Sequence, residues 1–333
     1  VEAAHALGLE PGGYSKKLDI DLDAVTGAAA AMVAIHRRLF EIMKSNEWGL
    51  GLDLDSEFLH DFRVAVRRTR SALSQIKGVF PKTSTDHFKR EFSWLGKITS
   101  PCRDLDVWRL KLPSYASILP SEIRRDLEPL RVFLDRHQKT EHQKVVALLE
   151  STRYAYLKRD WKAFLDTDPA SLESQANSSR PILELASERI WRNYKRVLAR
   201  GSAVDADSAA DTLHKLRIDC KKLRYLLEFF RRLYPPAETR QLIEGLKRLQ
   251  DNLGDFNDFE VLRARLQEFE QAMALERVAP ATTVLAMGHL AQELEEGQRR
   301  ERERFHRRYE KFSSRKNRQR FKELFKSPGE GRT

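Results

Sequence analysis

The stretch LHDFRVAVRRTRSAL at residues 59–73 returns as LHKLRIDCKKLRYLL at residues 213–227. The offset of 154 residues holds without a gap over 59–107 and 213–261, where ten of 49 paired positions are identical. Basic character persists even where the residue type changes, as at Arg67 and Lys221. A repeat with so long a period indicates two related halves, each built around one basic helix.

At 100° per residue, each of the two helices carries one basic stripe flanked by apolar residues. The members of the stripes are His60, Arg63, Arg67 and Arg70, and His214, Arg217, Lys221 and Arg224. Such a stripe can be a solvated face or the wall of a groove. Cations held close together repel one another, so a groove of this kind needs a bound polyanion or lowers the stability of the fold.

A second polar arc, of mixed charge, lies on another side of each helix. It contains Asp61 and Arg68 in the first copy and Lys215, Asp219 and Lys222 in the second. Mixed charge is typical of a face exposed to water. We therefore expect this arc to face solvent and the basic stripes to line a groove. Glu228 lies in the second stripe one turn beyond Arg224 and is expected to pair with it.

Charge is unevenly placed along the chain. The 333 residues include 60 Lys and Arg against 49 Asp and Glu, for a net charge of +11. The segments 59–77, 213–232 and 299–326 together carry +18, so the rest of the chain is at −7. Basicity concentrated in this way implies an anionic partner.

The two cysteines and the hydropathy pattern argue against a cysteine metal site, a disulfide-bonded fold and a membrane protein. Cys102 and Cys220 have no metal-binding or disulfide spacing, and Cys220 is expected in the core. A reducing cytoplasm is the expected location. No apolar run approaches the ~18 residues of a membrane span, so no membrane partner is expected.

Helical periodicity runs through almost the whole chain, and strand signals are nearly absent. The expected fold is all-α, with two stacked antiparallel bundles of about four or more helices each. We expect a linker or tail at 1–21, a first bundle at 22–167, a linker at 168–180, a second bundle at 181–327 and a disordered tail at 328–333. Helix breaks are expected between Pro113 and Pro120 and at Gly254, and one long final helix over 281–325.

Phosphate is the anion that the stripes suit best. Arg binds phosphoryl oxygens through paired hydrogen bonds, and Lys adds a compact charge. A His beside bound phosphate has a raised pKa. Two facing stripes form a ladder of cations along a line, which suits a linear polymer of phosphates better than one small ligand.

Catalytic signatures are weak, and we expect no catalytic residue, no cofactor and no metal. The chain has no Walker loop, GxSxG, HExxH or dinucleotide-binding motif. Four acids form short motifs, Asp104 with Asp106 and Asp255 with Asp258, and acids in such places are usually helix caps. His60 and His214 lack the carboxylate or cysteine partners that a metal site requires.

Nucleic acid is the alternative partner. The segment 299–326 interleaves Arg and Lys with Phe305, Tyr309, Phe312, Phe321 and Phe325. A basic aromatic helix can contact phosphates and stack on bases. We favour the simpler interpretation of a packed terminal helix whose aromatic residues lie in the core. Since no recognised DNA- or RNA-binding module is present, nucleic acid ranks second.

The same residues resemble a known family, the CHAD domain (conserved histidine α-helical domain). Four blocks occur in the family's order: LHDFRVAVRRTR from residue 59, LGKITSPCRDLDV from 95, LHKLRIDCKKLRYLLEFF from 213 and LKRLQDNLGDFND from 246. The likeness covers roughly residues 22–325. The resemblance implies two stacked four-helix bundles related by pseudo-twofold symmetry, with a basic central channel. It also implies inorganic polyphosphate as ligand and a cytoplasmic location at polyphosphate granules.

The resemblance also implies site residues. The signature histidines are His60 and His214, and the channel cations are Arg63, Arg67, Arg70, Arg217, Lys221 and Arg224. Arg68, Lys97 and Lys222 match the pattern less well. The two copies differ where Asp251 occupies the position of Lys97 and Asn257 occupies that of Arg103. The second copy is therefore expected to hold phosphate less evenly in this region.

CHAD domains often follow a CYTH-type triphosphate-processing domain. The stretch GGYSKKLDI at 12–20 resembles the tail of such a neighbour. On this interpretation, catalysis belongs to an upstream domain in the full-length chain, and the present residues only bind.

Overall fold

The computed structural model describes residues 20–172, 175–205 and 207–326. These residues are mostly helical and contain no strand, only an isolated bridge between Gly27 and Pro181. The all-α prediction is therefore confirmed. The tail expected at 328–333 and nearly all of the segment expected at 1–21 lie outside the described residues.

The helices of the first half precede residue 173. They are α2 (Ala28–Ser45), α3 (Glu47–Gly51), α4 (Ser56–Gln75), α5 (Lys82–Ile98), α6 (Ser100–Ala116), α7 (Ser121–Arg124), η1 (Arg125–Leu127), α8 (Glu128–Glu150), α9 (Thr152–Asp166) and η2 (Pro169–Leu172). The second half consists of α10 (Ile182–Ser202), α11 (Ala210–Phe229), η3 (Arg231–Leu233), α12 (Pro236–Leu275), α13 (Ala281–Phe312) and α14 (Arg315–Phe325). The repeated stretches lie in α4 and α11.

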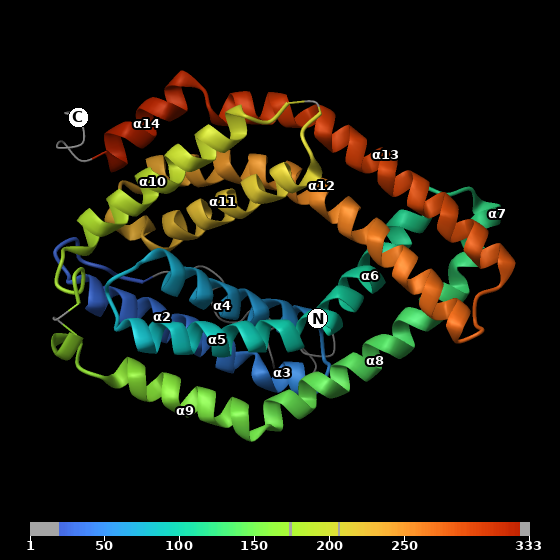
Figure 1. Ribbon diagram of the computed structural model, residues 1–333, viewed down its shortest axis with the longest axis horizontal. Helices are drawn as coiled ribbons and strands as arrows, with labels where there is room; N and C mark the ends of the chain where they lie inside the picture. The colour runs from blue at the N-terminus through green and yellow to red at the C-terminus, as the bar shows by residue number, and fades with distance from the viewer. Residues whose placement is uncertain (1–19, 173–174, 206, 327–333) are drawn as a thin grey trace.

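Apolar side chains fix α4 and α11 in the interior. Phe62 and Val66 of α4, and Leu216 and Cys220 of α11, are at most 2% exposed, as their positions beside the basic stripes predict. They belong to one hydrophobic cluster that contains residues of both halves. The two helices pack against each other and face one another across the middle of the molecule (Figure 1).

A second hydrophobic cluster joins the two halves at the opposite end of the molecule. There α6 and α8 of the first half meet α12 and α13 of the second (Figure 1). The cluster includes Trp108 from α6, Phe133 from α8, Met273 from α12 and Leu290 from α13, all nearly inaccessible. The halves are therefore joined at two places. One lies beside α4 and α11, and the other lies where α6 and α8 meet α12 and α13.

Reciprocal ion pairs link α6 and α12. A carboxylate oxygen of Asp104 lies 3.2 Å from Arg265, and one of Asp258 lies 3.2 Å from Lys111. The repeat offset of 154 relates Asp104 to Asp258 and Lys111 to Arg265. A twofold relation between the copies predicts this exchange of partners, because each carboxylate then meets the cation of the other copy.

The helix boundaries correct two predictions and confirm one. The break expected between Pro113 and Pro120 lies at residues 117–120, between α6 and α7. α12 runs unbroken through Gly254, where a break was expected. The first copy does break at the matching place, between α5 and α6, because Pro101 there has no amide hydrogen and restricts the residue before it. The long final helix is interrupted by Ser313 and Ser314, which separate α13 from α14.

The mixed-charge arc was expected to face solvent, but only part of it does. Asp219 is 2% exposed and pairs with Arg196 and Arg200 of α10. Asp61 is also buried, and Arg68 pairs with Glu228 of α11. Lys215, by contrast, is exposed as expected. Asp219 and Arg68 are withdrawn from water because each pairs with a neighbouring helix, which a helical wheel of one helix cannot show.

We expect Trp161→Ala to lower the free energy of unfolding by about 3–5 kcal/mol, because it empties a large volume from the first bundle. Trp161 is fully buried, with its ring 4.5 Å from that of Phe88 and 5.2 Å from that of Phe92. Urea titration followed by circular dichroism measures the change. Trp48→Ala is the matched control: Trp48 is 51% exposed, and its loss should cost less than about 1 kcal/mol. Equal costs at the two positions would contradict this packing.

Candidate functional site

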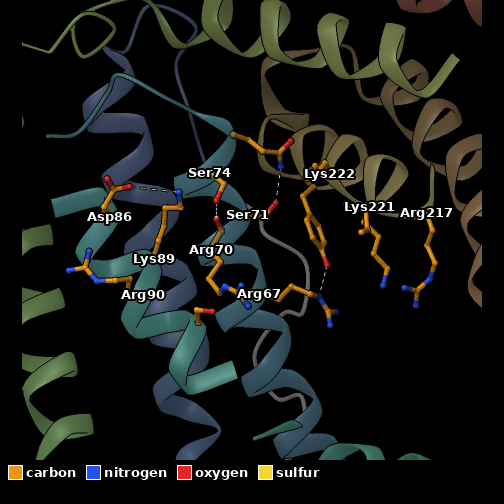
Figure 2. Close-up of a pocket in the computed structure, with 14 residues that line it drawn as sticks. Arg67, Arg70, Ser71, Ser74, Asp86, Lys89, Arg90, Arg217, Lys221 and Lys222 are labelled. Atoms are coloured by element: carbon orange, nitrogen blue, oxygen red, sulfur yellow. Dashed lines mark hydrogen bonds and ion pairs between the residues drawn. The ribbon is translucent and has the colours of Figure 1, made fainter. Parts of the chain in front are cut away.

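A basic groove lies where α4, α5 and α11 meet, and we call it the α4–α11 groove. It has a volume of about 770 Å³. Seven cations and one carboxylate line it: Arg67, Arg70, Lys89, Arg90, Arg217, Lys221, Lys222 and Asp86. Ser71, Ser74, Gln75, Ser93, Ile218 and Tyr225 complete the wall. Figure 2 shows Arg67 of α4 and Arg217 and Lys221 of α11 extending into the same space.

Several cations of the groove have no counterion. Arg70, Arg90 and Lys221 form no ion pair with any carboxylate in the part of the chain that the structure describes. The lining carboxylate, Asp86, is already 2.8 Å from Lys82 and 3.9 Å from Lys89. The groove therefore presents an excess of positive charge that a bound polyanion would neutralise.

The pKa of Lys221 is lowered in this basic groove. Burial, together with the charges of Arg217 and Arg67, lowers the pKa of Lys221 to about 7, and Asp258 opposes the change only in part. Burial likewise lowers the pKa of Arg217, against the pull of Asp258, 3.6 Å away. A nearby anion would favour the charged form of Lys221 and restore its pKa.

Tyr225 positions Arg67 within the groove. Its hydroxyl accepts a 2.7 Å hydrogen bond from Nε of Arg67, so a residue of one repeat orients a cation of the other. The remaining guanidinium nitrogens of Arg67 stay available for a ligand. The matching position in the first copy is Ser71, which also lines the groove and accepts a hydrogen bond from Gln75.

Arg63 is predicted as a channel cation, but its guanidinium already has partners. It donates to the carbonyl oxygen of Gly96 at 2.8 Å and to the hydroxyl of Thr99 at 2.6 Å, at the junction of α5 and α6. Burial lowers the pKa of Arg63 to about 10, with Asp104 acting in the opposite direction. Arg63 does not line the α4–α11 groove, and it joins α4 to the α5–α6 junction.

Arg68 and Arg224 share one carboxylate. Glu228 lies 2.6 Å from Arg68 and 3.3 Å from Arg224, as was expected for the second pair. Neither arginine lines the groove. The repeat places Ser74 where α11 has Glu228, so the groove side of α4 lacks the equivalent carboxylate and Arg70 remains unneutralised.

The signature histidines lie outside the groove lining. His214 is exposed, and its Nδ1 is 2.6 Å from the amide oxygen of Asn257. His60 is half-buried, and burial together with the charge of Arg103 lowers its pKa. Because Asn257 and Arg103 occupy matching positions, one histidine is held by a hydrogen bond while the other lies beside a cation. Lys97 is exposed and also outside the lining.

The sequence analysis missed the contribution of α5. Lys89 and Arg90 line the groove, but the matching positions of the second copy hold Ile243 and Glu244. The sequence analysis selected cations that occur in both copies, so it did not identify Lys89 and Arg90. Lys222, which matched the family pattern less well, does line the groove.

The acidic motifs are not helix caps. Asp104 and Asp258 form the reciprocal ion pairs between α6 and α12, and Asp255 and Asp258 lie inside the unbroken α12. Asp106 accepts a hydrogen bond from Gln138, and burial raises its pKa to about 6. Asp104 and Asp258 thus connect α6 to α12.

The aromatic residues of the basic C-terminal segment are buried. Phe305, Tyr309, Phe312, Phe321 and Phe325 are at most 9% exposed, which confirms the packed terminal helix. The ring of Phe321 stacks on that of Tyr194, with centroids 3.7 Å apart. These rings are not available to stack on bases, which removes the main observation that favoured nucleic acid as a ligand.

The fold and groove define an all-α protein with a positively charged groove between two repeats. A model of the CHAD domain matches residues 34–267, and the chain belongs to this family. None of the described helices combines the length and the apolar character needed to cross a membrane.

Two solved structures share the fold. The CHAD domain from the plant Ricinus communis is 28% identical with a TM-score of 0.69, and the match covers 85% of this chain and 94% of that one. PptA from Streptomyces chartreusis is 14% identical with a TM-score of 0.60, over 83% of this chain and 99% of its own. The uncharacterized protein Rv2226 of Mycobacterium tuberculosis is 30% identical over 134 residues, which are 40% of this chain. The match spans about a quarter of that relative's length, 24%.

We expect Lys221 to titrate near pH 7 in the unliganded protein, because burial and adjacent arginines disfavour its charged form. Reductive methylation with ¹³C-formaldehyde followed by NMR across pH 5–11 measures the titration, and Lys221→Arg assigns the signal. As pH rises, this resonance should move well before those of exposed lysines, whose ordinary pKa is about 10.4. A Lys221 signal that moves together with the exposed lysines would contradict the crowding of cations.

Proposed function

We propose that this chain binds inorganic polyphosphate without acting on it chemically, and that the α4–α11 groove holds the polymer. The observation that carries the proposal is the set of seven groove cations, of which Arg70, Arg90 and Lys221 have no ion pair with a described carboxylate. A chain of phosphates supplies closely spaced negative charges without bulky groups, so it can neutralise cations along a groove. Membership of the CHAD family supports the same ligand.

The residues divide into two roles in this proposal. Arg67, Arg70 and Lys221 contact phosphates directly, together with Lys89 and Arg90 of α5. His60, Arg63, His214 and Arg224 act at the margins, by holding helices in place or by adding to the positive potential. Multivalent contact predicts affinity that grows with polymer length until the groove is filled.

Polyphosphate granules are the proposed location in the cell. A granule is a concentrated form of the ligand, so a protein with several weak phosphate contacts would accumulate there by mass action. Association with an upstream CYTH-type domain stays a prediction, because nearly all of the residues it depends on, 12–19 of 12–20, lie outside the described residues.

Arg67→Gln combined with Lys221→Gln should weaken binding of long-chain polyphosphate by tenfold or more, about 1.4 kcal/mol, at about 150 mM salt. Both side chains extend into the groove, and neither forms an ion pair that the fold would lose. Fluorescence anisotropy in competition with single-stranded and duplex DNA measures the affinity and its preference. The matched control removes two paired, exposed cations, Lys215→Gln with Lys144→Gln. Unchanged polyphosphate affinity in the groove variant, or tighter binding of DNA by the unmodified protein, would reject the proposal.

Polyphosphate binding at pH 8 should take up close to one proton per groove. Lys221 is largely neutral there when its pKa is about 7, and bound phosphates raise that pKa again. Affinity should therefore fall as pH rises from 7 to 9. Calorimetry in two buffers of different ionisation enthalpy measures the uptake. Lys221→Gln should abolish it; a similar uptake in that variant would place the proton elsewhere.

A further inference from the structure

A second basic cleft lies on the outside of the second half, between α12 and the turn that joins α13 to α14. We call it the α12–α14 cleft, and its volume is about 240 Å³. Five cations line it, namely Arg248, Arg308, Lys311, Lys316 and Arg320. No residue of α4, α5 or α11 contributes to its lining, so it is separate from the α4–α11 groove.

The cations of this cleft are unneutralised. None of the five forms an ion pair with a carboxylate among residues 20–172, 175–205 and 207–326. Glu244, an exposed residue, is the carboxylate in the lining. Earlier in α13, by contrast, Arg299 and Arg304 pair with Glu296 and Glu301. Arg308 and Arg320 are moreover partly buried, which raises the cost of leaving them without an anion.

A second hollow, of about 700 Å³, adjoins the cleft at Glu244. Arg240, Arg231 and Arg232 line that hollow together with Thr239. The two spaces share Glu244 as a lining residue, so they follow α12 one after the other. Basic side chains thus border an extended path along the outer side of this helix, as a linear anion requires.

The fold itself does not require these charges. The repeat places Asp86 of the first half at the position of Arg240, and Trp94 at that of Arg248. The first half therefore has no cation at these two positions, although it has Lys89 and Arg90 at those of Ile243 and Glu244. The charges of Arg240 and Arg248 are thus particular to the second copy, and an anionic ligand explains them more easily than packing does.

The lining indicates which class of anion fits. Its one aromatic residue, Phe312, is 2% exposed, so no ring is available to stack on a base. Recognition then depends on phosphate groups alone. We propose that the α12–α14 cleft is a second binding site for a linear phosphate chain, which allows one molecule to hold polyphosphate at two separate places. The choice of inorganic polyphosphate over other phosphate polymers rests on the function proposed above.

The test compares four proteins by calorimetry with a linear polyphosphate too short to span both sites. They are the unmodified chain, the groove variant Arg67→Gln with Lys221→Gln, the cleft variant Arg308→Gln with Arg320→Gln, and the two variants combined. We expect two sites in the first and one in each single variant. In the groove-variant background, the cleft substitutions should weaken the residual binding by about tenfold or more at low salt.

Matched controls separate a local site from loss of net charge. Arg315→Gln with Lys322→Gln removes two cations from α14 that do not line the cleft, and binding should change by less than about twofold. Arg308→Lys with Arg320→Lys keeps the charges and should retain most of the affinity. Circular dichroism verifies the fold of each variant.

The possible failures are distinguishable. Residual binding that survives the cleft substitutions, or falls equally in the Arg315 and Lys322 control, overturns the second site and leaves the groove untouched. Complete loss of polyphosphate binding in the cleft variant, with no loss in the groove variant, would instead reject the groove as a binding site. Cleft substitutions that weaken binding of duplex DNA but not of polyphosphate would identify nucleic acid as the ligand and overturn the proposal.

Discussion

Cations from α4, α5 and α11 face one space, and the structure must hold them there against their mutual repulsion. The lowered pKa of Lys221 is the local consequence, since burial, together with the charges of Arg217 and Arg67, makes its charged form less favourable. Hydrophobic packing opposes the repulsion. Each basic stripe is flanked by buried apolar residues, such as Phe62 and Leu216, that fix the helix independently of its charges.

Carboxylates are placed at the edges of this basic region and leave its centre unneutralised. Asp258 contacts Arg217 and Lys111 at the α6–α12 side, and Glu228 contacts Arg68 and Arg224 between α4 and α11. The pairs Asp258–Lys111 and Glu228–Arg68 join helices from the two halves, so they stabilise the relative placement of the stripes. Arg70, Arg90 and Lys221, which form no ion pair with a described carboxylate, line the groove where a linear anion would pass.

The sequence was sufficient to predict the helical class, the two basic stripes and the burial of the residues beside them, because the repeat reports each feature twice. It was insufficient wherever a side chain meets another helix. The mixed-charge arc was assigned to solvent, yet Asp219 is buried against arginines of α10. Arg63 was assigned to the ligand, yet it is bonded to Gly96 and Thr99. Lys89 and Arg90 were missed because the second copy has no cation at either place.

The central claim is that polyphosphate occupies the space between the repeated helices. A crystal structure of the chain with a linear polyphosphate tests it most directly. The account predicts a continuous row of phosphates in the α4–α11 groove, with oxygens within hydrogen-bonding distance of Arg67 and Lys221, about 3 Å. A polymer bound elsewhere on the molecule, with the groove cations contacting only water, would contradict it.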